Sequence, residues 1–110
     1  MAAKYDLKKA KGAQYLFNLK AANGQVVLTS ERYKAKASAK KGIESVRTNA
    51  KKAKQFERRQ AKNGKPYFVL LAGNGEPIGR SQMYSSKAAM EKGIRCVKKD
   101  GPKARVDDQG

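Results

Sequence analysis

Histidine and tryptophan are absent from this 110-residue chain, and cysteine occurs once. Without histidine, the chain cannot carry a histidine-based acid–base pair, catalytic triad or metal site. The single Cys96 excludes an intramolecular disulfide bond and is typical of a reducing compartment. No stretch approaches the ~20 apolar residues of a spanning helix, and residues 1–9 contain no apolar run of a signal peptide. We therefore expect a cytoplasmic protein that does not associate with membranes.

Acidic residues are scarce. Nine of them stand against 26 lysines and arginines, which gives a net charge of +17. This balance favours polyanions such as nucleic acid, but it also keeps a small protein soluble, and charge alone does not separate the two interpretations. The acids are scattered, with no pair at a spacing that suggests acid–base catalysis. We expect no enzyme activity, cofactor or metal, and we expect Cys96 to be a plain free cysteine.

One stretch of the chain occurs twice, without gaps, at an offset of 51 residues. The first copy contains Phe17, Asn23-Gly24, Ser30, Tyr33, Gly42-Ile43 and Val46, and the second contains Phe68, Asn74-Gly75, Ser81, Tyr84, Gly93-Ile94 and Val97. A fixed period near 50 indicates a duplicated supersecondary unit. Each half is too small to bury a sufficient core alone. The prediction is one domain, 1–110, built of repeat one (1–52) and repeat two (53–110).

Within each repeat, apolar alternation predicts strands and a helical stripe predicts one helix. Residues 4–9 and 14–21 alternate as half-buried strands, and Asn23-Gly24 predicts a hairpin. We prefer a three-residue loop, 22–24, which would place Leu19 opposite Val27 and, in repeat two, Leu70 opposite Ile78. Pro77 should lie at an edge or a bulge.

The helix of repeat one should run from about residue 35. Its apolar stripe comprises Ala39, Gly42, Ile43 and Val46. Because a glycine recurs in mid-helix in both copies, the backbone there should lie close to the sheet. The second helix should be capped by Ser85-Ser86 and should stop at 100–102.

Residues 54–59 align with two other segments. They match residues 4–9, which open repeat one, and residues 105–107, which close repeat two. This double match predicts one central strand that serves both repeats. Residues 107–110 should fray at the chain end.

The tandem pattern from Phe17 to Val46 and from Phe68 to Val97 resembles the YegP-like family, a bacterial domain family of unknown function. The resemblance implies an α+β fold of two tandem β-β-β-α-β units. They would share one mainly antiparallel sheet with exchanged terminal strands and two helices on one face. It also implies a monomer with pseudo-two-fold symmetry, since this chain resembles the fused form. No activity and no site residues are carried over.

Two surfaces are candidate binding sites. At 100° per residue, Lys36, Lys40 and Arg47 fall on one side of the first helix, and Lys87 and Lys98 take equivalent places on the second. These residues would bind phosphate groups of nucleic acid without sequence preference.

The alternative is a structural or protein-interaction domain whose basic charge is only solubilising. Its contact surface would be the sheet face that carries Tyr67, Val69 and Leu71, which is apolar for a face in solvent. The first hypothesis predicts steep salt dependence of binding, and the second predicts a protein partner.

Overall fold

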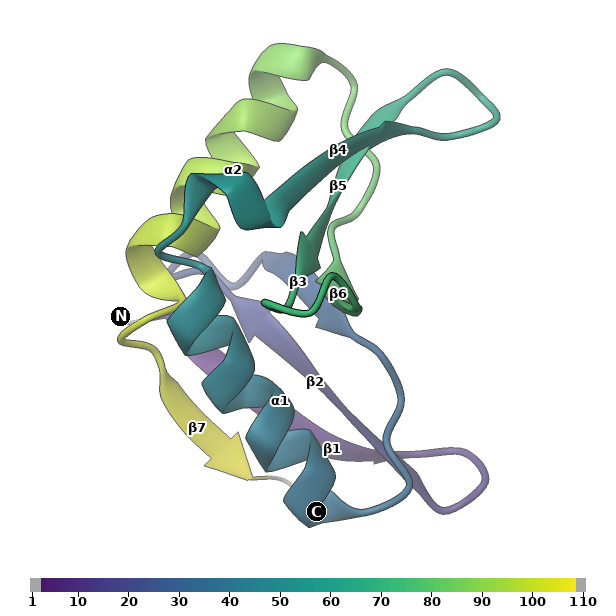
Figure 1. Ribbon diagram of the computed structural model, residues 1–110, viewed down its shortest axis with the longest axis vertical. Coiled ribbons are helices and arrows are strands. Elements are labelled where there is room, and N and C mark those ends of the chain that lie inside the picture. Colours follow the sequence, from purple (N-terminus) through teal and green to yellow (C-terminus); the bar gives the residue numbers. More distant parts are fainter. Residues whose placement is uncertain (1–2, 109–110) are drawn as a thin grey trace.

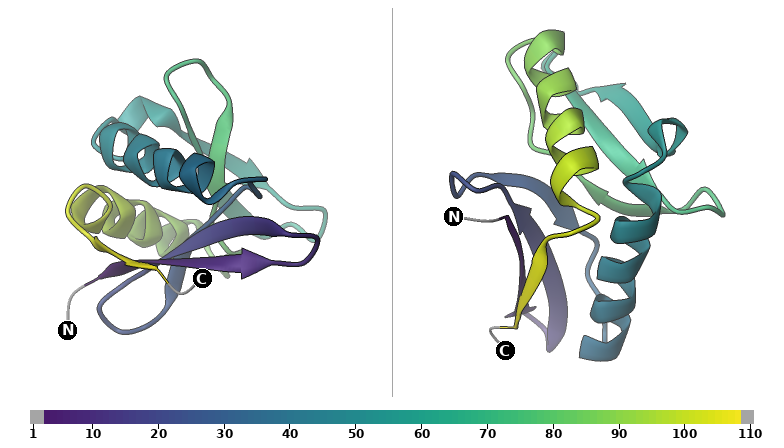
Figure 2. Two further views of the ribbon diagram at one scale, coloured as in Figure 1. Left: turned by 90° about the horizontal axis from the view of Figure 1, so that it is seen from below. Right: turned by 90° about the vertical axis from the view of Figure 1, so that its left-hand side faces the viewer.

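The computed structural model describes residues 3–108. They form one mixed sheet and two helices (Figure 1). The elements in chain order are β1 (Lys4–Ala10), β2 (Gln14–Lys20), β3 (Val26–Ser30), α1 (Lys36–Asn49), the 3-10 helix η1 (Ala53–Gln55), β4 (Phe56–Gln60), β5 (Pro66–Leu71), β6 (Pro77–Arg80), α2 (Lys87–Asp100) and β7 (Arg105–Asp108). Both helices cover the same face of the sheet (Figure 2). The predicted α+β class is confirmed.

The described strands lie in the order β4-β5-β6-β3-β2-β1-β7. Each repeat contributes an antiparallel meander, and the two meanders join where β3 pairs with β6 at the centre. The last strand, β7, crosses to the first repeat and pairs in parallel with β1. This crossing is the predicted exchange of a terminal strand. It holds the chain end through Asp108, so the predicted fraying at 107–108 is wrong, and residues 109–110 lie outside the described range.

The prediction of one central strand at residues 54–59 is wrong. β4 lies at one end of the described sheet and pairs only with β5. At the 51-residue offset, residues 54–57 correspond to β7 and residues 56–60 correspond to part of β1. A single stretch cannot occupy both places side by side, and the hairpin with β5 decides which one it takes. Exchange therefore occurs at one end of the sheet and not at the other.

Both hairpins have the predicted three-residue loop but a different register beyond it. In repeat one the Ala21 N–H donates to the Gln25 carbonyl, and Gly24 has a φ of 87°. A bulge then shifts the pairing, so that Leu19 lies opposite Leu28 instead of Val27. Repeat two behaves alike: Leu70 lies opposite Gly79, not Ile78, and Pro77 lies beside the bulge as predicted. The extra residue at each bulge, Val27 or Ile78, is buried in the core.

The two helices pack through the predicted stripes. Ala39, Gly42, Ile43 and Val46 are all buried in α1, and Met90, Gly93, Ile94 and Val97 are buried in α2. Ser86 caps α2 by accepting a hydrogen bond from the Ala89 N–H. The two mid-helix glycines each lie over a tyrosine ring that is stacked on a core phenylalanine, 6.3 Å between centroids.

No helix within residues 3–108 is long and apolar enough to span a membrane.

Candidate functional site

The basic stripe predicted on α1 is occupied by the chain's own C-terminal strand. The Asp108 carboxylate lies 3.2 Å from the Lys36 Nζ and 3.8 Å from the Lys40 Nζ. β7 brings Asp108 to this place because its pairing with β1 carries it past the N-terminal half of α1. Two of the predicted phosphate ligands therefore share one carboxylate of the molecule itself, which offsets part of their charge.

Arg47, the third residue of that stripe, points towards the interior. Its guanidinium donates to the Ala104 carbonyl at 2.8 Å and lies 5.6 Å from the centre of the Tyr5 ring. It also forms an ion pair with Glu44. These contacts connect α1 to β1 and to the segment before β7, so Arg47 has a structural role between the two repeats.

On α2 the equivalent cations are more accessible. Lys87 and Lys98 are exposed, and neither forms an ion pair within residues 3–108. Glu91, which replaces Lys40, accepts a bidentate interaction from Arg58 of β4 at 2.5 and 2.8 Å. This hydrogen bonding lowers the pKa of Glu91, which keeps the pair charged.

The fold gathers further lysines that the helical pattern did not single out. The C-terminal ends of α1 and α2 meet near the pseudo-two-fold axis (Figure 1), where a Cβ built on Gly101 would lie 3.1 Å from the Ala50 Cβ. Exposed lysines flank this contact. We call them the helix-end cluster: Lys51, Lys52, Lys98, Lys99 and Lys103. The sequence contains each of them, but only the packing of one helix end against the other makes them neighbours.

The helix-end cluster is positioned to attract anions. None of its members forms an ion pair with another described residue. Asp100, an acid close to the junction, accepts a hydrogen bond from the Cys96 thiol at 3.4 Å. Lys98 and Lys99, in the last turn of α2, also compensate the negative end of that helix dipole, which keeps them compatible with the fold.

The predicted apolar sheet face is not an open patch. Val69 is only 3% exposed, and Tyr67 and Leu71 are partly buried. Val69 lies between Glu57 of β4 and Arg80 of β6 in the strand register. A strand-face valine between two long side chains is therefore not part of an exposed apolar surface.

The chemistry of the described residues is limited. Burial, together with the hydrogen bond to Asp100, raises the pKa of the Cys96 thiol to about 11, so it is a poor nucleophile near neutral pH. No group of three or more acids, cysteines or histidines that could hold a metal occurs within residues 3–108.

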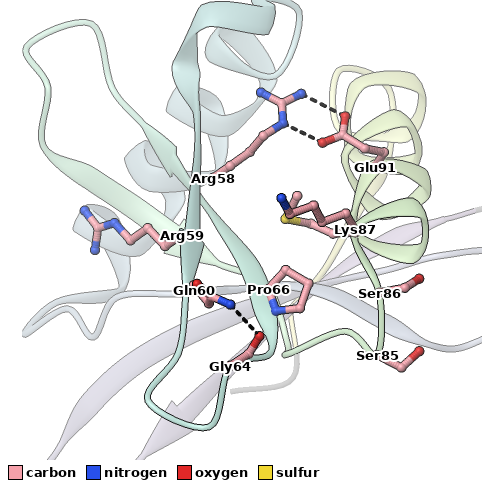
Figure 3. Close-up of a pocket in the computed structure, with 10 residues that line it drawn as sticks. Arg58, Arg59, Gln60, Gly64, Pro66, Ser85, Ser86, Lys87 and Glu91 are labelled. Carbon is pink, nitrogen blue, oxygen red and sulfur yellow. Dashed lines mark hydrogen bonds and ion pairs between the residues drawn. The ribbon is translucent and has the colours of Figure 1, made fainter.

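A pocket of about 530 Å³ separates β4 from the first turns of α2 (Figure 3). Arg58 and Lys87 enter it from opposite sides, and Arg58 reaches across to Glu91. Arg59 points the other way in the same view and pairs with Glu57. The pocket lies beside the strand that ends the described sheet.

Comparison with known proteins gives consistent relatives over the whole chain. The family model "Domain of unknown function (DUF1508)" matches twice, at residues 10–57 and 61–108. A UPF0339 protein of Pseudomonas aeruginosa is 54% identical over 109 residues, covering 99% of both chains. The UPF0339 protein YegP of Yersinia pestis is 47% identical over 104 residues, covering 94% of this chain and 93% of the other.

Solved structures agree with the fold. The solution structure of the protein of unknown function yegP from E. coli has a TM-score of 0.93 at 46% identity and covers 99% of this chain and 94% of its own. A UPF0339 protein from Shewanella oneidensis has a TM-score of 0.92 at 47% identity, covering 98% and 92%. With two matched repeats and relatives this similar over nearly full length, the chain belongs to the DUF1508 (UPF0339) family, which includes YegP.

Proposed function

We propose that this protein is a non-catalytic binding module that holds nucleic acid weakly through its phosphate groups. The observation that supports this proposal is the helix-end cluster, five exposed lysines at one junction with no ion pair among the described residues. The α1 stripe contributes less, because Lys36 and Lys40 face Asp108.

Binding of this kind depends on release of counterions. Each phosphate neutralised on duplex DNA changes the slope of log K against log salt by about −0.9. Five contacts therefore give a slope of roughly −4 to −5, with dissociation constants on the order of 10⁻⁴–10⁻⁶ M at physiological salt. Little preference among base sequences is expected, because phosphate contacts do not read base edges.

The test compares two triple variants of equal net charge. One carries Lys51→Gln, Lys52→Gln and Lys98→Gln within the helix-end cluster. The other carries Lys8→Gln, Lys11→Gln and Lys62→Gln, three lysines that are also exposed but lie elsewhere. Fluorescence anisotropy with labelled duplex DNA, titrated at several salt concentrations, measures the slope for each.

The cluster variant should reduce the slope by about 2–3, and the control should reduce it much less. If both triple variants behave alike, the cluster is not a site. The basic charge would then be only solubilising, and a structural or protein-interaction role would be the better account.

A further inference from the structure

The edge of β1 shows how this fold accepts an added strand. β7 pairs in parallel with β1, so that Val106 lies beside Tyr5 and Asp108 lies beside Leu7. Asp108 then reaches Lys36 and Lys40 of α1, and Asp107 reaches Lys4 at 3.2 Å. In β7 an apolar residue, Val106, is thus followed two positions later by the acid that reaches α1.

The pseudo-symmetric place, along the outer edge of β4, has no strand from residues 3–108. The residues that would fill it by symmetry, 54–57, lie partly within β4 itself and partly in η1. Alternate backbone N–H and C=O groups of an antiparallel edge strand point away from its partner. An open edge of this kind is a template for a further strand.

The surroundings of the β4 edge retain one of the three lysines that hold β7 at the β1 edge, because Lys36 has a counterpart but Gln55 stands in the place of Lys4. At the 51-residue offset, Lys87 corresponds to Lys36, and Lys87 forms no ion pair among the residues of the described range. Arg58 replaces Leu7 and adds a positive charge on the same face of the strand, facing α2 (Figure 3). Glu91 replaces Lys40, and Arg58 neutralises it. The pocket beside β4 is therefore a counterpart of the place where Asp108 is held.

We infer that the outer edge of β4 binds an extended segment of a partner protein as an added parallel strand. By the register of β7 on β1, the segment carries an apolar residue beside Phe56. Two positions later it carries an aspartate or glutamate beside Arg58, within reach of Lys87. Main-chain hydrogen bonds provide the affinity, and the alternate side chains provide the specificity. This site is separate from the helix-end cluster and does not depend on nucleic-acid binding.

A partner segment fits this edge better than a second copy of the chain. Two copies with a net charge of +17 each repel one another, whereas an acidic segment is attracted. For β7 of a second copy to occupy this place as β7 occupies the β1 edge, it would first have to leave β1 of its own sheet.

The chain contains a suitable probe. A synthetic peptide with the sequence of residues 102–108, PKARVDD, acetylated and amidated, has the required apolar-x-acid pattern. Titrating it into ¹⁵N-labelled full-length protein should shift the amide resonances of Phe56–Gln60 and of the first turn of α2. Replacing the last aspartate of the peptide by asparagine, or Lys87 by Gln in the protein, should weaken binding about fivefold, the scale of one exposed charge pair.

The matched control is Lys98→Gln, which removes the same charge from the other end of α2 and should leave peptide binding unchanged. Three outcomes overturn the inference. The first is resonance shifts that spread over the helix-end cluster and that Lys98→Gln reduces as much as Lys87→Gln does. The second is shifts confined to β1 and β7. The third is the absence of shifts at millimolar peptide. Because this experiment measures peptide binding at β4, its result does not depend on the outcome of the DNA titrations of the helix-end cluster.

Discussion

At the scale of single residues, Gly42 and Gly93 each take the helix position where a tyrosine lies against the backbone. A Cβ built on Gly93 would lie 2.7 Å from the Tyr84 Cζ, and one on Gly42 would lie 2.8 Å from the Tyr33 Cζ. The sequence predicted a close approach there, and it is confirmed. The recurring tyrosines, whose role the sequence pattern did not reveal, are the reason for it.

These contacts predict that Gly93→Ala is destabilising although alanine is the better helix former. The methyl group would overpack against Tyr84 and cost about 1–3 kcal/mol, which over most of that range is more than the ~1 kcal/mol gained in helix propensity. The Tyr84 hydroxyl is buried with no hydrogen-bond partner among the described residues. Tyr84→Phe should therefore be neutral or stabilising, and Gly93→Ala should cost less in that background.

Urea denaturation of the two single variants and the double variant measures this coupling. Gly73→Ala serves as the control, because a Cβ there meets nothing within 4 Å and the φ of Gly73 is not positive. Its effect on the free energy of unfolding should be small. Strictly additive effects of Gly93→Ala and Tyr84→Phe would contradict the contact.

At the scale of elements, β7 stabilises the open side of β1 mainly through its backbone. Four residue pairs connect the two strands, and Tyr5 and Leu7 on the helix side of β1 are fully buried. A chain truncated after Ala104 should lose about 2–6 kcal/mol, at about 0.5–1.5 kcal/mol for each of roughly four backbone hydrogen bonds. The double variant Asp107→Asn, Asp108→Asn removes only partly exposed ion pairs and should cost no more than about 1 kcal/mol for each.

Urea denaturation at low and high salt separates the two contributions to β7. The loss caused by the double asparagine variant should shrink at high salt, and the loss caused by truncation should persist. Equal losses for both proteins at low salt would show that backbone pairing with β1 contributes little.

Elements that depend on residues close together in the chain could be predicted from the sequence, whereas the choice between distant strand partners could not. The Asn-Gly loops, the Ser86 cap and the helix stripes depend on residues a few positions apart. The bulge at Val27 depends on how β3 fits between β2 and β6. The alternation of apolar and polar residues along β3 does not indicate this. The place of β4 in the sheet depends on whether this segment takes the position that β1 has in repeat one or the position that β7 has, since its sequence matches both. The surroundings of the candidate site were missed for the same reason, since Asp108 meets Lys36 only after β7 crosses to the first repeat.

At the scale of the whole molecule, the repeats complete one another across the pseudo-two-fold axis. The Tyr5 hydroxyl, in repeat one, donates to the Gly101 carbonyl at 2.5 Å, and Arg47 donates to the Ala104 carbonyl. β3 of repeat one also pairs with β6 of repeat two. Because the first two contacts are buried or partly buried, separating the repeats would leave polar groups without partners as well as exposing apolar surface.

We therefore predict that residues 1–52 do not fold alone as a monomer. The fragment keeps β1, β2, β3 and α1 but loses both strands that flank its meander, and about 50 residues bury too little surface to compensate. Circular dichroism under urea should show no cooperative transition for the fragment. An equimolar mixture with residues 53–110 should regain one, since the second fragment brings β6 and β7. A cooperative transition of the isolated fragment that does not change with concentration would contradict the prediction, because it would mean that repeat one holds a sufficient core without its neighbour.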